Sequence, residues 1–180
     1  MKCAALALFS MLITACLDDN VGPPVETAAS TSSQLPQYDT FTFGWTASPP
    51  LGYATSHRSL DVDLRLRTLV GSALRDKGYV EDDVNPSFLV RVGAGIKHIA
   101  PHVPKEPDRL GADANDAITL EGIQIVIYDV GLKTEVWQGL ADSVVDPKKA
   151  IDDGSLRSEV QAALSAFPVR SITAAYPFRG

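Results

Sequence analysis

The segment 118–129 constrains the fold most, because apolar residues alternate along it as they do on a strand with one buried face. The alternating set is Ile123, Ile125 and Ile127. Residues 130–133 then contain a glycine and read as a turn, and residues 134–144 alternate again. Two such runs joined by a short glycine-containing link predict an antiparallel hairpin.

The alternation changes phase within the first of these runs. Ile118 and Leu120 have the opposite parity to the three isoleucines, and Gly122 lies between the two sets. One extra residue in a strand reverses the face on which every later side chain lies. The pattern therefore predicts a β-bulge near Gly122.

Four further elements follow from periodicity in the rest of the chain. Alternating residues predict strands, and apolar residues at three- and four-residue steps predict amphipathic helices with one buried face. These elements are a strand at 38–45, a helix at 60–77, a strand at 87–97 and a helix at 156–167. The strand at 87–97 is expected to have one face toward the helices and one toward solvent.

Side chains near the helix ends indicate where each helix begins and stops. Ser59 or Asp61 can cap the first helix, and Gly78 is placed to close it in a left-handed conformation. Ser155 or Asp153 can cap the second helix.

The order of elements is strand, helix, strand, strand, strand, helix. It predicts an α+β two-layer sandwich, with a mixed, mostly antiparallel sheet of about four strands and two helices on one face. We expect a single domain over residues 38–180. A loop at 98–117, with three prolines and no periodicity, is the first place to look for a variable recognition surface.

The N-terminus has the layout of a cleavable export signal. Lys2 precedes an apolar run that is too short to span a bilayer, and the run ends in Ile13-Thr14-Ala15-Cys16. This ending resembles a bacterial lipobox, so we expect a signal peptide at 1–15 and lipidation of Cys16. The alternative is an ordinary secretory signal with an incidental cysteine.

Residues 16–37 are expected to form the lipidated cysteine and a disordered tether, because few large apolar residues occur there. Some 20 flexible residues would span about 25 Å. A lipoprotein with acyl chains such as palmitate would meet the two-signal requirement for stable anchoring. Leu17, where an aspartate would favour inner-membrane retention, points to the periplasmic face of the cell outer membrane. Cys3 leaves with the signal, so no internal disulfide is expected.

The charge balance argues against nucleic acid as a partner. The chain has 16 Lys and Arg against 22 Asp and Glu, for a net charge of −6. Phosphate binding needs clustered basic residues. We therefore expect no nucleic-acid partner, and membrane attachment through the lipid on Cys16 rather than through the protein surface.

Several short motifs together resemble the bacterial lipoprotein family of domain of unknown function 4136. They are Trp45 in its aromatic strand, Lys77-Gly78-Tyr79, residues 85–90, Glu121-Gly122 with the strand to Asp129, Val136-Trp137-Gln138-Gly139, and Phe167-Pro168. The chain departs from the family pattern at Ser87 and Gln138, where acidic and basic residues are usual. The resemblance implies a lipid-anchored envelope protein with a two-layer α/β domain, and it supplies no catalytic residues.

The histidines give little support for a metal site. His98 and His102 are four residues apart, but Pro101 and Pro104 exclude a regular helix between them. His57 is distant in sequence. We expect exposed loop histidines, with no metal and no cofactor.

Two carboxylates and two tryptophans are the remaining candidates for chemistry. Asp129 ends a strand before a turn, where it can accept hydrogen bonds from turn amides, or it can pair with Glu121 for acid–base work. Trp45 and Trp137 can stack on a sugar, although tryptophans in strands more often pack in a core. Neither feature defines a catalytic residue, so no enzyme activity is expected.

The sequence thus predicts a non-enzymatic interaction or scaffolding domain, anchored by lipid in the periplasm, with an envelope protein as its possible partner. The alternative is a small module that binds or hydrolyses envelope glycan. An apolar cleft with convergent carboxylates and a tryptophan would favour that alternative. An uncleft domain with an exposed sheet edge would favour the interaction domain.

Overall fold

The computed structural model describes residues 25–29, 35–99, 118–146 and 148–171. Within these ranges one sheet contains six strands in the order β1-β6-β5-β4-β2-β3. The strands are β1 (Val25–Ala29), β2 (Thr40–Phe43), β3 (Val80–Glu81), β4 (Phe88–Ile99), β5 (Ile118–Asp129) and β6 (Thr134–Val145). The helices are α1 (His57–Asp76) and α2 (Asp153–Ala163), with a 3-10 turn at Leu35–Gln37.

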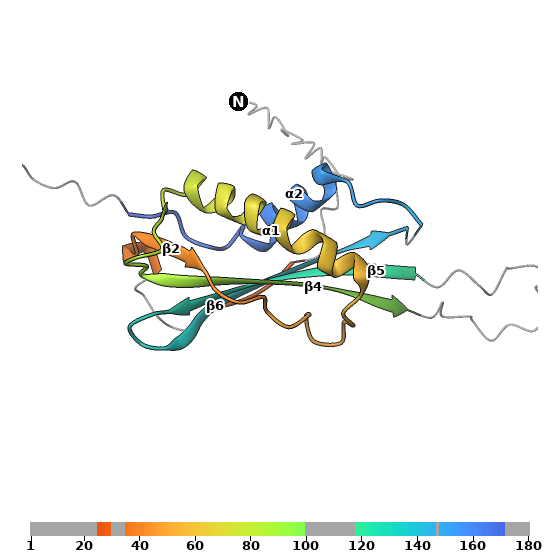
Figure 1. Ribbon diagram of the computed structural model, residues 1–180, viewed down its shortest axis with the longest axis horizontal. Helices are drawn as coiled ribbons and strands as arrows, with labels where there is room; N and C mark the ends of the chain where they lie inside the picture. Colours follow the sequence, from red (N-terminus) through yellow and green to blue (C-terminus); the bar gives the residue numbers. More distant parts are fainter. Residues whose placement is uncertain (1–24, 30–34, 100–117, 147, 172–180) are drawn as a thin grey trace, which may run out of the picture.

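Both helices lie on the same face of the sheet (Figure 1), which confirms the α+β two-layer sandwich. The pairs β1–β6, β6–β5 and β5–β4 are antiparallel, whereas β2 is parallel to β3 and to β4. The sheet is therefore mixed and mostly antiparallel, as predicted. Its six strands exceed the four expected, because the short edge strands β1 and β3 add to the predicted set.

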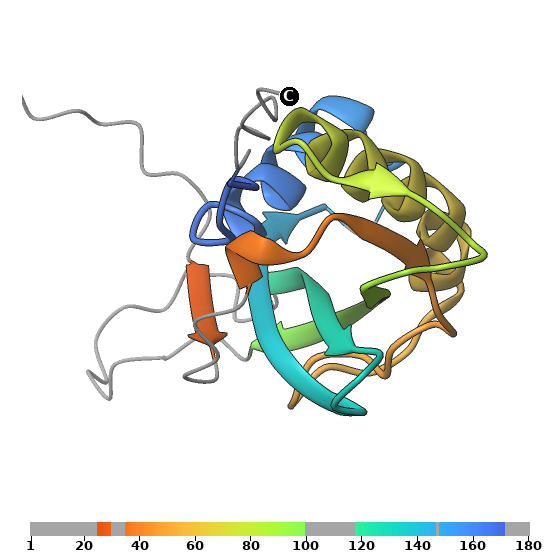
Figure 2. The ribbon, with the colours of Figure 1, turned by 90° about the vertical axis from the view of Figure 1, so that its left-hand side faces the viewer.

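β1 corrects the predicted domain boundary. It lies within the segment expected to be a disordered tether, so the folded domain includes Val25–Ala29 and is not limited to residues 38–180. β1 forms one edge of the sheet beside β6 (Figure 2), with Thr27 opposite Gly139. Its sequence has a single large apolar residue, and backbone hydrogen bonds to β6 define it. The signal peptide, Cys16 and residues 17–24 lie outside the described residues.

The predicted hairpin is confirmed as β5 and β6, but the bulge predicted at Gly122 is wrong. Gly122 pairs in continuous register with Gly95 of β4 and with Asp142 of β6. The irregularity in the β5–β6 register lies between Ile127 and Tyr128 instead.

The apparent change of phase has a different cause. Thr119 and Glu121 lie on the helix-facing side of β5 and are buried, in register with the isoleucines. Ile118 and Leu120 lie on the opposite face. The sequence pattern changes phase because two polar residues occupy buried positions at one end of an otherwise apolar face.

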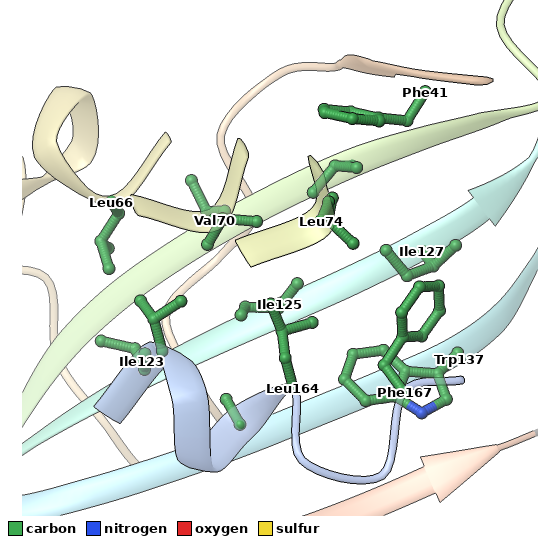
Figure 3. Close-up of a cluster of buried hydrophobic side chains, with 14 of the residues drawn as sticks. Phe41, Leu66, Val70, Leu74, Ile123, Ile125, Ile127, Trp137, Leu164 and Phe167 are labelled. Carbon is green, nitrogen blue, oxygen red and sulfur yellow. The ribbon is translucent and has the colours of Figure 1, made fainter. Parts of the chain in front are cut away.

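The core fills the space between the helices and the sheet (Figure 3). Its largest side chains are aromatic, and the ring centroids of Trp137 and Phe167 are 5.0 Å apart. Phe88 also contacts Phe41 and Tyr79. Aliphatic side chains complete it: Val62, Leu66, Val70 and Leu74 from α1, Ile123, Ile125 and Ile127 from β5, and Leu156, Val160 and Leu164 from α2 and its C-terminal end.

The second face of the sheet is partly covered by residues 44–56, which we call the strap (Figure 1). The Tyr53 ring lies so close to Gly122 that an added Cβ there would be 2.6 Å from it, and Gly93 and Gly95 are equally crowded by the strap. The Tyr53 hydroxyl donates a hydrogen bond to Asp142 at 2.5 Å. The expectation that this face of β4 meets solvent is therefore wrong at the glycines.

Only the C-terminal end of α1 agrees with the sequence prediction. Gly78 has φ +94°, which confirms it as the residue that closes the helix. The helix begins at His57, two residues before Ser59. Neither Ser59 nor Asp61 therefore occupies the position before its first turn.

α2 begins and ends slightly earlier than predicted. Asp152 is its N-cap and accepts a hydrogen bond from the Ser155 backbone at 3.1 Å, so the cap lies one residue before Asp153. The helix stops at Ala163 rather than Phe167. The loop predicted at 98–117 is shorter than expected, because His98 and Ile99 belong to β4; its remaining residues lie outside the described ranges.

Candidate functional site

Lys77 and Tyr79, from the motif that follows α1, connect the segment before β2 to the segment after α2. The buried hydroxyl of Tyr79 donates to the carbonyls of Leu35 and Pro168, at 3.3 and 3.2 Å. Burial raises the pKa of Tyr79 to about 12, and the charge of Arg170 opposes this. The Lys77 ammonium donates to the Phe167 carbonyl at 2.8 Å. These residues therefore have a structural role.

The two tryptophans have different environments. Trp137 is 2% exposed and packs in the core, as expected for a tryptophan in a strand. Gly139 lies beneath the end of α2, where an added Cβ would collide with the Ala163 carbonyl. Trp45 is 88% exposed, so the prediction that it packs in the core or on the sheet is wrong. It follows β2 at the start of the strap.

Asp129 has the predicted structural role at the hairpin turn. Its carboxylate accepts hydrogen bonds from the Tyr38 hydroxyl and from the Leu132 backbone, the latter at 2.6 Å. Burial alone would raise its pKa, but bonds from Leu132, Tyr38 and Gly131 outweigh burial and lower it. At roughly 3.4 Å per residue, the eight residues to Glu121 place the two carboxylates about 27 Å apart, so they form no acid–base pair.

Glu121 instead lies near Glu159 of α2, and both are buried, at 1% and 3% exposure. Ser143 is opposite Glu121 on β6, and its hydroxyl donates to Oε1 of Glu159. Burial raises the pKa of Glu159 to about 7; the Ser143 bond opposes this and the charge of Glu121 adds to it. Glu121 interrupts an apolar face, which is a partial signal in the sequence, but no pattern links it to Glu159.

The histidines do not gather. His57 is the exposed first residue of α1, and His98 lies exposed on β4 with its Nδ1 3.1 Å from the Thr119 hydroxyl. Both are in regular elements, so the expectation of loop histidines is wrong for them. His102 is outside the described residues. Within the described ranges, no three histidine, cysteine or carboxylate side chains are grouped as metal ligands would be.

A polar groove lies where β3 ends beside β2, and we call it the β2 groove. It encloses about 440 Å³. Its lining residues are Thr42, Phe43, Arg67, Thr68, Arg75, Glu81 and Asp83. Its charged groups balance one another, as in the Arg75–Glu81 ion pair at 2.8 Å.

The backbone of β2 is open at this groove. The Asp82 amide donates to the Phe41 carbonyl at 2.8 Å, and the Gly44 amide donates to Val90 at 2.9 Å. Because backbone groups of successive residues point to opposite sides of a strand, Phe43 turns its amide and carbonyl toward the groove. β3 pairs only as far as Phe41, so this edge extends beyond it.

The side chains around this edge fix its shape. The Arg67 guanidinium lies 5.6 Å from the centre of the Phe43 ring and donates to the Gly44 carbonyl at 2.9 Å. The Thr42 hydroxyl donates to Asp83. An extended segment could pair with Phe43 here while its side chains met an aromatic ring and balanced charges.

The described chain is thus a two-layer α+β domain in which β2 has an open stretch of edge beyond β3 and two buried carboxylates lie between α2 and the sheet. The model of the family DUF4136, domain of unknown function, matches residues 25–169, and the chain belongs to this family. The match begins at the first residue of β1, in agreement with the corrected boundary.

Solved structures with a similar fold have low sequence identity. A PelC dodecamer from Paraburkholderia phytofirmans is 12% identical with a TM-score of 0.50, over 82% of this chain and 99% of that one. A DUF4136 family protein from Bacteroides thetaiotaomicron is 14% identical with a TM-score of 0.44, over 80% and 95%. The similarity to the PelC structure bears on the fold alone. A search of curated proteins gave no match.

The prediction of membrane attachment rests on the N-terminal sequence. Among the helices that the structure describes, none has the length and apolarity that a bilayer span requires. Cys16 lies outside the described residues, so its lipidation stays a prediction from the sequence.

Proposed function

We propose that this protein is a lipid-anchored component of the bacterial cell envelope, whose periplasmic domain binds a partner protein through the edge of β2. The role is non-enzymatic. The observation that carries the proposal is the open edge at Phe43, flanked by the β2 groove and the exposed Trp45. Edges of this kind accept an extended segment of another chain as an added strand.

The geometry of the carboxylates favours binding over hydrolysis. Asp129 is engaged by turn amides and a tyrosine hydroxyl, and Glu121 and Glu159 are buried between α2 and the sheet. Hydrolysis of a glycan requires two carboxyl groups on either side of an accessible sugar bond. Asp129, Glu121 and Glu159 do not have that arrangement.

The corrected boundary shortens the tether in this proposal. Residues 17–24 separate Cys16 from β1, and eight residues extend over at most about 28 Å. A domain on so short a connection would stay close to the headgroups and meet partners on the same membrane at high effective concentration.

Replacement of Cys16 tests the anchor. We expect Cys16→Ala to move the protein from the membrane to the soluble fraction, and to abolish labelling by an alkyne analogue of palmitate. Cys3→Ala is the matched control and should change neither result. Membrane retention of the Cys16 variant would refute the anchoring proposal.

Site-specific crosslinking tests the binding edge. A photo-crosslinking residue at Asp83, in the β2 groove, should give a discrete adduct in intact cells, identified by mass spectrometry. The same residue at the exposed Leu132, in the β5–β6 turn, is the control and should give none. Equal adducts at both positions, or none at Asp83, would contradict the proposed edge; an adduct of twice the mass would identify a second copy as the partner.

Exposure of Trp45 favours a second candidate, a glycan-binding module. A bare indole beside a polar groove is the kind of surface on which a sugar ring stacks. Purified cell-wall glycan should then retain the wild-type protein and release Trp45→Ala. Equal retention of both proteins would remove this candidate.

A further inference from the structure

The sheet face opposite the helices has apolar side chains at one end, beyond the strap. The strap crosses the row of paired residues that contains Gly122, and two further rows lie beyond it. Residues directly opposite one another on neighbouring strands lie on the same face of a sheet. The two rows are Lys97–Leu120–Val144 and Ile99–Ile118. Their apolar members, Ile99, Ile118, Leu120 and Val144, form one surface, which we call the apolar patch.

The apolar patch is open to solvent. Val144 is 72% exposed, Ile118 46% and Ile99 39%. The strap lies on the same face of the sheet (Figure 1) and carries Leu51, which is fully exposed. Exposed apolar side chains gathered on one surface mark a contact with a partner or a membrane.

The charge at the apolar patch is a cation. Lys97 is the single charged residue in the two rows; it is exposed, and its Nζ lies 5.8 Å from the centre of the Tyr53 ring. The chain as a whole has a net charge of −6, so this surface differs from the average of the protein. A lysine can hold its ammonium at lipid phosphates while its stem lies along apolar surface. The surface therefore matches the boundary of a phospholipid layer.

The chain enters the domain close to the apolar patch. β1 is antiparallel to β6, so its first residue lies toward the end of the sheet at which β6 finishes, and Val25 is opposite Ala141. Val144 is three residues further along β6, or about 10 Å. Residues 17–24 connect Cys16 to Val25 over at most about 28 Å. A bilayer that holds a lipid on Cys16 is therefore within reach of the patch.

The edge of β2 stays clear of such a contact. β2 pairs with the beginning of β4, where Phe43 is opposite Val90, whereas Ile99 ends the same strand. The nine steps from Val90 to Ile99 correspond to about 30 Å along β4. Contact between the patch and a membrane would thus leave the β2 groove free for a partner.

We propose that the apolar patch rests on the phospholipid bilayer, with its aliphatic side chains among the headgroups and Lys97 at the phosphates. The lipid on Cys16 holds the protein on the membrane, and the patch sets the orientation of the domain. The inference rests on the lipid anchor of the proposed function and is independent of partner binding at β2.

Quenching by labelled lipid in the full-length lipidated protein tests the contact. With Cys16 acylated and Cys3 removed, Val144→Cys introduces a single free thiol, which is labelled with the fluorophore NBD. The vesicles contain phosphatidylethanolamine, phosphatidylglycerol and a phosphatidylcholine with a doxyl quencher near its headgroup. We expect several-fold stronger quenching than for Leu132→Cys, the control at an exposed position in the turn of the same hairpin. Ile118→Cys is a second test position and should match Val144→Cys.

Flotation of the same vesicles separates this inference from the anchor. Protein that does not float would overturn the lipid anchor, and this inference with it. Protein that floats but is quenched equally at positions 144 and 132 would overturn this inference alone. So would a label at position 144 that neither aqueous iodide nor the doxyl lipid quenches, because a second copy or another segment of the chain would then cover the patch.

A charge reversal tests the place of the lysine. Lys97→Glu should weaken the quenching at position 144, because it puts a carboxylate against anionic phosphatidylglycerol headgroups. Lys133→Glu, at an exposed position in the β5–β6 turn, is the matched control and should leave the quenching unchanged. Equal quenching in the two variants would overturn the placement of Lys97 at the phosphates.

Discussion

The two ends of β5 carry buried acidic side chains on the same face, with opposite consequences. At the hairpin end, Asp129 accepts several hydrogen bonds, and its pKa is lowered despite burial. At the other end, Glu121 lies beside Glu159, whose pKa is raised to about 7. Both side chains have low exposure, 5% for Asp129 and 3% for Glu159, but Glu159 lies deeper in the fold. The two sites also differ in the hydrogen bonds that reach each carboxylate.

The difference lies in the backbone around each site. The turn after Asp129 has amides without partners in the sheet, and those of Leu132 and Gly131 point at the carboxylate. Around Glu159 the helix and the strands have already used their amides in their own hydrogen bonds. Among the described residues, the hydroxyls of Ser143 and Ser155 donate to Glu159. The turn thus lowers the pKa of Asp129, whereas burial at the helix–sheet interface raises that of Glu159.

Removal of the Asp129 carboxylate should have the largest effect. Asp129→Ala leaves the Tyr38 hydroxyl and the Leu132 amide without their acceptor, so we expect a loss of about 3 kcal/mol in the free energy of unfolding. Urea denaturation at pH 7 measures it. Asp76→Ala, at an exposed position of α1, should change the stability by less than about 0.5 kcal/mol. Comparable losses in both variants would contradict the role assigned to Asp129.

The pH dependence of the Asp129 contribution should run opposite to that of Glu159. Its pKa lies below the ordinary value of 3.8, so the stabilisation is present above that value and is lost as the pH falls through the folded pKa. The difference in unfolding free energy between wild type and Asp129→Asn should therefore shrink from pH 7 to pH 2. A difference that is constant over this range would show that the charge of Asp129 plays no part.

Tyr38→Phe should have a smaller effect at the same end of β5. It removes one donor and leaves the turn amides, so we expect a loss of about 1 kcal/mol. The pKa of Asp129 should rise, because a bond that lowers it is gone. Denaturation and carboxyl titration by NMR measure the two effects. Tyr128→Phe is the control, and an equal loss there would assign the effect to packing rather than to the hydrogen bond.

Ser143→Ala should give the smallest change and sharpen the comparison at the other end. The Ser143 hydroxyl favours the charged form of Glu159, so its removal should raise the pKa of that group above its present value of about 7. Infrared titration of the Glu159 carboxyl should therefore show its midpoint at a higher pH than in the wild type. A shift to lower pH would mean that the hydroxyl favours the protonated form instead.

The sequence predicted the elements whose periodicity reports burial directly. Ile123, Ile125 and Ile127 defined β5, and the stripe on α1 defined the helix above it. β1 was missed because its pairing comes from backbone hydrogen bonds and not from an apolar pattern. The predicted bulge is wrong because Thr119 and Glu121 are polar residues buried on the same face as the isoleucines.

The candidate sites were harder to predict than the fold. The β2 groove forms because β3 ends at Glu81. A strand of only two residues leaves no periodic pattern from which its end could be predicted. The partner of Glu121 lies 38 positions away on α2, and no local spacing links the two. Gly93, Gly95 and Gly122 are the trace of the strap that can be seen in the sequence. Glycines on a strand, however, do not identify the segment that crosses them.

The strap also bears on the order in which the chain folds. Tyr53 and Asp142 are 89 positions apart, yet the strap can seat against Gly122 and reach Asp142 only when β4, β5 and β6 are already side by side. The entropy cost of closing so long a loop must be offset before such distant contacts add to stability. The strap therefore belongs to the last phase of folding, and Tyr53→Ala should accelerate unfolding while leaving the refolding rate almost unchanged.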